Sequence, residues 1–446
     1  MANVCVIGAG LAGSEAAWQL AERGHKVMLL EMRPENNTPA HQTGFAAEMV
    51  CSNSFKSDDP LSATGILKAE MERLGSIILK SAREACVPAG LSLAVDRNLF
   101  SGLMTERLRN HSNIIWKTAL AAKPPIGPSG IPTIIASGPL TADPLARWIS
   151  DTFNESNLYF YDAIAPIVEK DSIDASIAFP ASRYDKGTPD FLNCPLNKEQ
   201  YERFVDALLT APRAPLHGFE ARFFEACLPI EIMAERGRDT LRYGPMKPVG
   251  LRDPKTNQRP YAIAQLRQDS IAGDMFNLVG FQTRLAWGAQ ADVFRLIPGL
   301  ERAIFSRFGS IHRNTYISAP RLLDVTLAVK NRPDLPGLFF AGQLSGVEGY
   351  LESAATGLAA AIAVDRHIRS LPPVEFPRQT MIGALLHYLA NADAKNFAPV
   401  NAMIGILPDL PEGILDTRAL KKRGGARGLK AAKREALRER ALAAIQ

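Results

Sequence analysis

A glycine motif near the N-terminus restricts the possible folds more than any other feature of the sequence. Asn3–Ile7 is an apolar run that predicts a strand, and Gly8-Ala-Gly-Leu-Ala-Gly follows it directly. Leu11–Arg23 has the pattern of a helix that ends at a glycine, and Lys26–Leu30 predicts a second strand that leads to Glu31. Strand, glycine motif, helix, strand and acid in this order are the fingerprint of a dinucleotide-binding unit.

Each residue of this unit has a physical role in holding a dinucleotide. Gly8 permits a tight turn, Gly10 lets a pyrophosphate approach the backbone, and Gly13 lets the helix lie close to the sheet. The helix N-terminus offers N–H groups to the phosphates, and Glu31, 18 residues beyond Gly13, is expected to bind ribose hydroxyls. The binding residues predicted in this part are Gly8, Ala9, Gly10, Gly13, Glu31 and Arg33.

A second glycine-rich segment favours FAD over NAD as the dinucleotide. Leu338–Ala341 predicts a strand that runs into Gly342, and after a glycine-punctuated loop a small-residue helix is expected from about Tyr350 to Ile368. In flavoproteins with this arrangement the helix N-terminus stabilises the negative charge of reduced flavin. The alternative is an alanine-rich helix that only packs on the sheet. The predicted cofactor contacts here are Gly342, Gln343, Gly346, Gly349 and Tyr350.

The 446 residues are enough for more than one domain. Ile131–Gly138 predicts a third strand, of the kind by which such chains re-enter the FAD domain, whereas Asn197–Leu209 predicts a helix in a region of different character. The expected fold class is α/β, a Rossmann-like FAD-binding domain of the glutathione-reductase type with an inserted α+β domain. The predicted divisions are residues 1–155 and 311–417 for the FAD-binding domain, 156–310 for the insertion and 418–446 for a C-terminal tail.

The positive charge of the chain is concentrated in this tail. The whole chain has a net charge of +5, and residues 418–440 alone carry ten Lys and Arg against two Glu. A basic excess at one end of a protein is typical of an edge that binds a polyanion. The alternative is a terminal helix that is merely solvated.

Cysteine and histidine usage excludes several classes of protein. The five cysteines are scattered without a Cys-x-x-Cys pair, so a disulfide framework and a disulfide-type flavoreductase are poor interpretations. The seven histidines have no metal-ligand spacing, and no metal is expected. No apolar run reaches the ~20 residues of a membrane span, and the N-terminus lacks the basic start of a signal peptide. A cytoplasmic protein that does not contact membranes is therefore expected.

Longer stretches of the sequence carry a more specific signal. They are Glu31-Met-Arg-Pro, Thr38-Pro-Ala-His, Val50-Cys-Ser-Asn-Ser, Phe224-Glu-Ala-Cys-Leu-Pro-Ile-Glu, Tyr243-Gly-Pro-Met-Lys-Pro-Val-Gly, Ile311-His-Arg-Asn-Thr-Tyr and Phe340-Ala-Gly-Gln-Leu-Ser-Gly-Val-Glu-Gly-Tyr. Together they resemble the family of folate- and FAD-dependent tRNA (uracil-5-)-methyltransferases, from Met1 to the basic tail. The resemblance implies that uridine 54 in the T loop of tRNA becomes 5-methyluridine. The carbon would come from 5,10-methylenetetrahydrofolate, and the reducing equivalents from NADH or NADPH through FAD.

Three other functions remain open at this point. The related enzyme that modifies an anticodon uridine shares the FAD domain but is longer, with a C-terminal helical domain for its GTPase partner. The same flavin chemistry could also act on a uridine of ribosomal RNA. A protein that only binds FAD and RNA is a third alternative, against which the retention of both Cys51 and Cys227 argues. No obligate protein partner is evident.

The chemistry of uracil methylation explains why two cysteines matter. C5 of uracil is a poor nucleophile until a thiolate adds to C6, and the C5 proton must later leave, which requires a nucleophile and a base. The resemblance assigns the nucleophile to Cys227, and it makes Cys51 the base or the guard of a flavin intermediate, but the order of these roles stays open. Cys5 and Cys86 are expected to be small buried hydrophobes, and Cys194 is left unassigned.

Candidate substrate residues are less specific. His41, His312 or Tyr350 could cover the pterin ring of the folate. The guanidinium and ammonium groups of the insertion could bind RNA phosphates or folate carboxylates, and those of the tail could bind RNA. These cationic residues are Arg242, Lys247, Arg267, Arg284, Lys421, Lys422 and Arg423.

Overall fold

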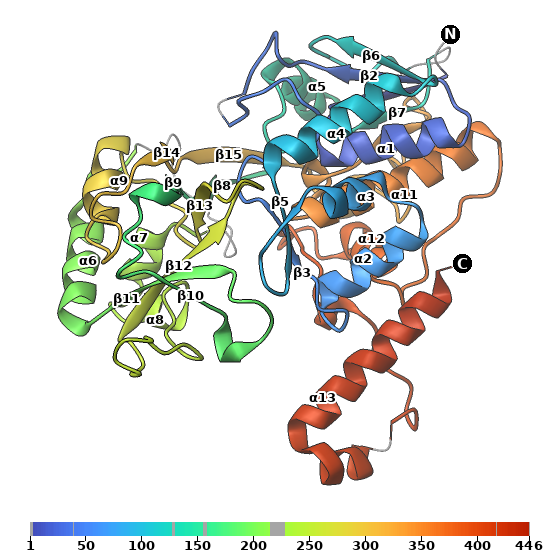
Figure 1. The fold of residues 1–446 in the computed structure, drawn as a ribbon. Helices are drawn as coiled ribbons and strands as arrows, with labels where there is room; N and C mark the ends of the chain where they lie inside the picture. Colours follow the sequence, from blue (N-terminus) through green and yellow to red (C-terminus); the bar gives the residue numbers. More distant parts are fainter. Residues whose placement is uncertain are drawn as a thin grey trace.

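The computed structural model shows two lobes and a long C-terminal helix that extends away from them (Figure 1). It describes residues 3–38, 40–126, 130–154, 158–214, 228–415 and 417–445, with the backbone alone for 158–163, 311–313 and 417–424. Within these residues, no helix is long and apolar enough to cross a membrane, and no group of acidic, histidine and cysteine side chains is arranged to hold a metal ion.

A parallel five-stranded sheet forms the centre of the first lobe. Its strand order is β16-β7-β1-β2-β6, and every neighbouring pair is parallel. Strand β1 is buried along its whole length, as expected of a short apolar strand covered on both faces. The strands are β1 Val4–Ile7, β2 Val27–Glu31, β6 Ile114–Thr118, β7 Thr133–Ile135 and β16 Leu338–Phe340.

Helices and a small antiparallel sheet complete this lobe. The closest helix pair is α1 with α11, which face each other across small residues. The three-stranded sheet has the order β3-β5-β4. The bounds are α1 Leu11–Glu22, α2 Ala63–Arg73, α3 Ile77–Glu84, α4 Arg97–Asn110, α5 Asp143–Phe153, α10 Ala319–Leu322, α11 Tyr350–Ile368, α12 Met381–Asn391, β3 Ser54–Ser57, β4 Cys86–Val87 and β5 Ser92–Val95.

The second lobe has its own sheet and its own apolar core. Its six strands are antiparallel in the order β10-β11-β12-β13-β9-β14, and a separate hydrophobic cluster lies beneath its helices. The antiparallel pair β8 and β15 connects it to the first lobe. The bounds are β8 Leu158–Ala163, β9 Ile167–Glu169, β10 Phe179–Ala181, β11 Phe191–Leu196, β12 Ala262–Gln268, β13 Met275–Leu278, β14 Phe305–Arg307, β15 Ile311–Tyr316, α6 Lys198–Thr210, α7 Ile230–Glu235, α8 Thr240–Tyr243 and α9 Trp287–Phe294.

The expected fold class is confirmed: a Rossmann-like parallel sheet carries an additional lobe built on a second sheet. The helix expected over Asn197–Leu209 is α6, which Asn197 begins by accepting the Gln200 N–H in a capping box. All six strands of the second sheet lie between residues 167 and 307. The four domain boundaries themselves stay a prediction.

The basic tail forms helix α13, Thr417–Ala444, with a backbone kink at Gly425. Its last turns are not simply solvated, because Leu437, Ala441 and Ile445 are buried in the core of the first lobe. Figure 1 shows the remainder of the helix standing away from that lobe. The tail therefore combines an apolar anchor with an exposed basic arm.

Candidate functional site

The turn between β1 and α1 is shaped to bring another molecule against the backbone. Gly8 has a φ of +98°, and a Cβ on Gly13 would lie 1.8 Å from the carbonyl oxygen of Gly8, so α1 packs directly on the turn. Gly10 differs, because a Cβ placed there meets no atom within 4 Å. The space beside Gly10 at the helix N-terminus is what a pyrophosphate needs, and the residues present fit a bound dinucleotide.

Glu31 is fixed at the end of β2 by its neighbours. Its carboxylate accepts the Ala9 N–H at 2.8 Å and the Arg33 Nε–H at 2.9 Å, and only 4% of the residue is exposed. Burial acts to raise the pKa of Glu31, but the hydrogen bonds and charge of Arg33 together with the Ala9 N–H outweigh it and lower the pKa. Arg33 also donates to Glu48 at 3.1 Å, which the sequence did not single out.

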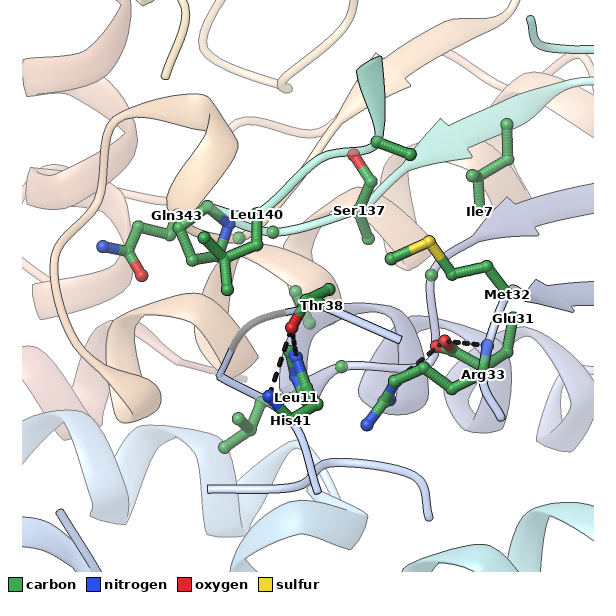
Figure 2. Close-up of a pocket in the computed structure, with 18 of the residues that line it drawn as sticks. Ile7, Leu11, Glu31, Met32, Arg33, Thr38, His41, Ser137, Leu140 and Gln343 are labelled. Atoms are coloured by element: carbon green, nitrogen blue, oxygen red, sulfur yellow. Dashed lines mark hydrogen bonds and ion pairs between the residues drawn. The ribbon is translucent and has the colours of Figure 1, made fainter. Parts of the chain in front are cut away.

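One cavity is lined by Gly8, Gly10, Glu31, Arg33 and Glu48. Figure 2 shows Glu31, Met32 and Arg33 toward one end and Leu140 and Gln343 toward the other. The cavity passes from the nucleotide end of the parallel sheet to the loop that precedes α11. This is the position expected of an FAD site.

The loop before α11 is held close to α1. Gly342 has a φ of +76°, and its N–H donates to the Thr356 hydroxyl at 2.8 Å. A Cβ on Gly357 would lie 2.1 Å from the carbonyl oxygen of Ala12, so the two helices cross in direct backbone contact. Gly346 packs against Phe397, where a Cβ would come within 2.5 Å of the ring. Gly346 lines neither this cavity nor the second cavity described next.

A second cavity adjoins the first and lies between the two lobes. Val50, Pro139, Leu140, Gln343 and Tyr350 line both cavities. Further lining residues come from the Cys51 segment and the loop before α11 on one side and from the second sheet on the other. They include Cys51, Lys56, Gly349, Arg267, Asn277 and Gln282. A molecule in the second cavity would therefore reach the Gln343 and Tyr350 end of the first.

Hydrogen bonds hold the backbone of Cys51 at both its N–H and its carbonyl group. Its N–H donates to the Tyr350 hydroxyl at 2.6 Å, and its carbonyl accepts from Arg97 Nη2 at 3.2 Å. Arg97 in turn forms a two-point ion pair with Asp269 of the second lobe, at 3.0 and 3.1 Å. Asn53 adds a further link, because its Nδ2 donates to the Gln268 carbonyl at 3.0 Å. The Cys51 segment is thus fixed relative to both lobes.

Three guanidinium groups give the surroundings of Cys51 a positive potential. They belong to Arg97, Arg267 and Arg307. Arg267 lines the second cavity and is only 8% exposed. Burial lowers the pKa of Arg267 to about 10, although Asp269 acts in the opposite direction. Burial also lowers the pKa of Arg307, and the charge of Arg97 adds to that effect. These positive charges would attract an anionic or oxygen-rich substrate.

Cys227 lies outside the described residues. The described chain on either side of that segment is anchored beside the second cavity. The Ala214 N–H donates to the Arg284 carbonyl at 2.7 Å, and the Ile230 N–H donates to the Gln282 carbonyl at 2.8 Å. Gln282 lines the cavity, whereas Arg284 does not.

The other candidates fall into three places. His41 lines the first cavity, where its Nδ1 lies 2.6 Å from the Thr38 hydroxyl, and does not line the second. Arg242 stacks over Tyr261 and pairs with Asp239, and Lys247 is exposed. Neither residue lines either of the two cavities. The side chains of His312, Lys421, Lys422 and Arg423 lie outside the described part of the structure.

The remaining cysteines divide differently from the expectation. Cys5 and Cys194 are fully buried, and burial raises the pKa of each thiol to about 12. Cys86 is exposed, so the expectation that it is a buried hydrophobe is wrong: it lies in the two-residue strand β4, whose Cys86 side faces outward. Sequence reasoning also missed Arg97, which contacts Cys51, and Asn277 and Asn314, which line the same cavity as Cys51, because these placements depend on pairing between distant segments.

The fold and the two cavities define the class of the protein: an α/β protein with a Rossmann-type dinucleotide cradle and a second ligand cavity that joins it. A family model described as "Glucose inhibited division protein A" matches residues 3–372. The enzyme named methylenetetrahydrofolate–tRNA-(uracil-5-)-methyltransferase TrmFO from Anoxybacillus flavithermus is 51% identical over 428 residues, 96% of this chain and 98% of its own length. Its namesake from Staphylococcus aureus is 53% identical over 418 residues, 93% and 94% of the two chains. The chain therefore belongs to the TrmFO family.

A solved structure shares the architecture. GidA from Aquifex aeolicus in its form I crystal superposes with a TM-score of 0.65 at 17% identity, covering 98% of this chain and 78% of that one. At this identity the likeness shows the fold alone.

Proposed function

We propose that the protein methylates C5 of uridine 54 in the T loop of tRNA, with 5,10-methylenetetrahydrofolate as the carbon donor. The residues of the first cavity would hold FAD, with NADH or NADPH as the source of its reducing equivalents, and the second cavity would hold the folate and the target uracil. The enzyme acts in the cytoplasm. Membership of the TrmFO family supports the reaction, and the resemblance of the sequence supports the choice of uridine and the cofactors.

The observation that carries this proposal is the junction of the two cavities. One contains the dinucleotide cradle, the other contains Cys51 and Arg267, and Gln343 and Tyr350 line both. A reductant bound in one and a one-carbon donor bound in the other would meet at these residues. Such an arrangement brings reacting groups together.

The residues of the first cavity bind and orient FAD, which when bound would supply the reducing equivalents. Gly10 and the N-terminus of α1 would face the pyrophosphate, whereas Gly8, Ala9 and Gly13 would shape the turn that holds them there. Glu31 accepts from the ribose hydroxyls, and Arg33 holds that carboxylate in position. Gly342, Gln343 and Tyr350 at the start of α11 line the opposite end, where the helix N-terminus would favour negative charge.

The cysteines act on uracil. The thiolate of Cys227 adds to C6, and Cys51 removes the C5 proton or protects the one-carbon intermediate. The hydrogen bond from the Cys51 N–H to Tyr350, together with the contact from Arg97, keeps that thiol at the junction of the cavities. The positive potential of Arg97, Arg267 and Arg307 would favour the approach of the RNA.

Mass spectrometry of RNA tests the reaction directly. Purified protein is incubated with tRNA, methylenetetrahydrofolate and either NADH or NADPH, and the digested RNA is examined for 5-methyluridine at position 54. A transcript with cytidine at position 54 is the control. Methylation of ribosomal RNA or of an anticodon uridine instead would replace the proposed substrate, and the absence of any product would overturn the proposal.

Cysteine variants test the assignment of roles. RNA with 5-fluorouracil at the target should form a covalent adduct, because fluorine does not leave as a proton does. Cys227→Ala should abolish the adduct and keep bound FAD, whereas Cys51→Ala should stop methylation and still form the adduct. The opposite pattern would exchange the two roles. Methylation by both variants would contradict the mechanism.

A further inference from the structure

Two asparagines in the second cavity have side chains that the fold leaves unsatisfied. Asn277 of β13 and Asn314 of β15 are each 3% exposed and line the cavity that contains Cys51. Within the part of the chain that the structure describes, the Nδ2 atoms of both are buried without a hydrogen-bond partner. Leaving a buried polar group unpaired costs free energy, of the order of 1–3 kcal/mol, so such groups require an explanation.

Other buried asparagines of the same region are satisfied. Asn53 is fully buried, and its Nδ2 donates to the Val95 and Gln268 carbonyls, both at 3.0 Å. Asn193, also fully buried, donates to three carbonyls of the second sheet. The side-chain amides of Asn53 and Asn193 are therefore paired within the fold. Among the described residues, the two asparagine side chains with an unpaired Nδ2, Asn277 and Asn314, both line the second cavity. This distribution indicates that a ligand completes them.

Arg267 adds a cationic donor to the same wall. It lies directly opposite Asn277 in the ladder between β12 and β13, which places both side chains on one face of the sheet. Its Nε donates to Asn53 Oδ1 at 3.0 Å, and no carboxylate among the described residues forms an ion pair with it. A buried guanidinium without a paired anion, beside two amide groups, suits a ligand whose edge is rich in oxygen acceptors.

We propose that Asn277 and Asn314 bind the carbonyl and N3–H edge of the target uracil, with Arg267 beside them stabilising the negative charge that develops on O4. The proposal rests on the proposed function of the site. An amide donates through NH₂ and accepts through its oxygen, which matches adjacent C=O and N3–H groups of uracil. A pterin presents the same C4=O and N3–H pair next to a 2-amino donor, so the folate affinity of the variants is the measurement that separates the two ligands. A phosphate has no donor for the amide oxygens.

The charge on O4 follows from the balance of the addition step. A thiolate forms the S–C6 bond, the C5=C6 π bond breaks, and its electron pair moves through C4 to O4, with no change in oxidation state. Donors already aimed at O4 lower the barrier to this step, and loss of one such donor typically costs about 100-fold to 1000-fold in rate. Asn277, Asn314 and Arg267 would thus act before any carbon is transferred.

The test measures adduct formation with RNA that contains 5-fluorouracil. The holoenzyme is compared with Asn277→Asp and Asn314→Asp, which keep the shape but replace the NH₂ donor by a carboxylate oxygen. Asn98→Asp is the matched control, since Asn98 is exposed on α4 and lines neither cavity. Bound FAD is read from its absorbance, and folate affinity from titration of the flavin signal with methylenetetrahydrofolate.

We expect Asn277→Asp and Asn314→Asp each to slow adduct formation by about 100-fold or more. Bound FAD and folate affinity should stay close to those of the unsubstituted protein. An unchanged adduct rate, or a loss confined to folate affinity, would overturn the proposal. If the aspartate variants fail to fold, Asn277→Ser and Asn314→Ser decide by the same criteria. Absence of the adduct in the unsubstituted protein would instead contradict the proposed function itself.

Discussion

At the scale of single residues, the glycines serve two different purposes. Gly13 and Gly357 have no room for a Cβ, which would lie 1.8 and 2.1 Å from backbone oxygens. Gly10 has open space on the side where a Cβ would point. The first two are needed for the fold, whereas Gly10 is free of that requirement, which fits the proposed approach of a ligand there.

Substitution of Gly10 should therefore separate cofactor binding from folding. In Gly10→Val the side chain would occupy the place of the pyrophosphate, and we expect loss of bound FAD, measured as flavin absorbance per protein. The free energy of unfolding of the apoprotein should change by less than about 1 kcal/mol, because no described atom is displaced.

The matched control is Gly102→Ala. Gly102 lies inside α4, and a Cβ there also meets no atom within 4 Å. Replacing a helical glycine by alanine should stabilise the protein by about 0.5–1 kcal/mol and leave FAD bound. A yellow Gly10→Val protein with the flavin content of the unsubstituted protein would contradict the assignment of the first cavity.

At the scale of elements, the start of α12 depends on a carboxylate from another helix. Glu70 of α2 is fully buried and accepts the Met381 and Ile382 N–H groups at 2.7 and 2.9 Å. These are among the N–H groups that a helix leaves without internal partners. Burial raises the pKa of Glu70 to about 7, although both hydrogen bonds act in the opposite direction.

This raised pKa predicts a specific pH dependence of stability. The folded protein holds the Glu70 proton more tightly than the unfolded chain, so raising the pH from about 5 to 8 should lower the free energy of unfolding, by about 3 kcal/mol from this group. Chemical unfolding of the unsubstituted protein and Glu70→Gln at both pH values measures it. Between pH 5 and pH 8, the unsubstituted protein should lose more of its free energy of unfolding than Glu70→Gln does.

The same substitution at Glu72 is the control, since Glu72 lies on the exposed face of α2. A stability difference between Glu70→Gln and the unsubstituted protein that is equal at both pH values would show that Glu70 titrates alike in the folded and unfolded chains.

At the scale of the whole molecule, α13 joins a basic arm to the body of the first lobe. Leu437, Ala441 and Ile445 are buried, and Arg73 of α2 donates to the Leu442 carbonyl. Removing residues 418–446 would expose this apolar contact and disturb the lobe itself. Neutralising the exposed cations tests the arm more cleanly than truncation does.

We expect Arg427→Gln, Lys430→Gln and Arg434→Gln together to weaken tRNA binding and to flatten its salt dependence. If all three contact phosphates, the slope of log affinity against log salt should fall by roughly 2 to 3. Filter binding at several salt concentrations measures the slope, and FAD content should stay unchanged. The same change at Lys80, Lys123 and Arg378, which are exposed elsewhere, is the control. Equal slopes for both triple variants would show that the arm does not contact the RNA.

The sequence by itself determined the local units of the protein. The β1–α1–β2 unit and α11 lie where spacing and glycines predicted them, because turn conformations, helix ends and apolar periodicity depend on neighbouring residues. The cofactor contacts proposed at Gly10 and Glu31 rest on the same local pattern. The TrmFO family could also be inferred, since its motifs are short continuous segments.

Only the tertiary structure decided what surrounds Cys51. The hydrogen bond to Tyr350 spans 299 residues, and the pairing of Asn277 with Arg267 depends on the register between two strands. A register shift of one residue in either strand would turn its side chain to the other face and separate the pair without changing any local pattern. The buried end of α13 and the exposure of Cys86 likewise depend on what packs against them. Such contacts are set by burial over the whole fold, which no single segment of the sequence encodes.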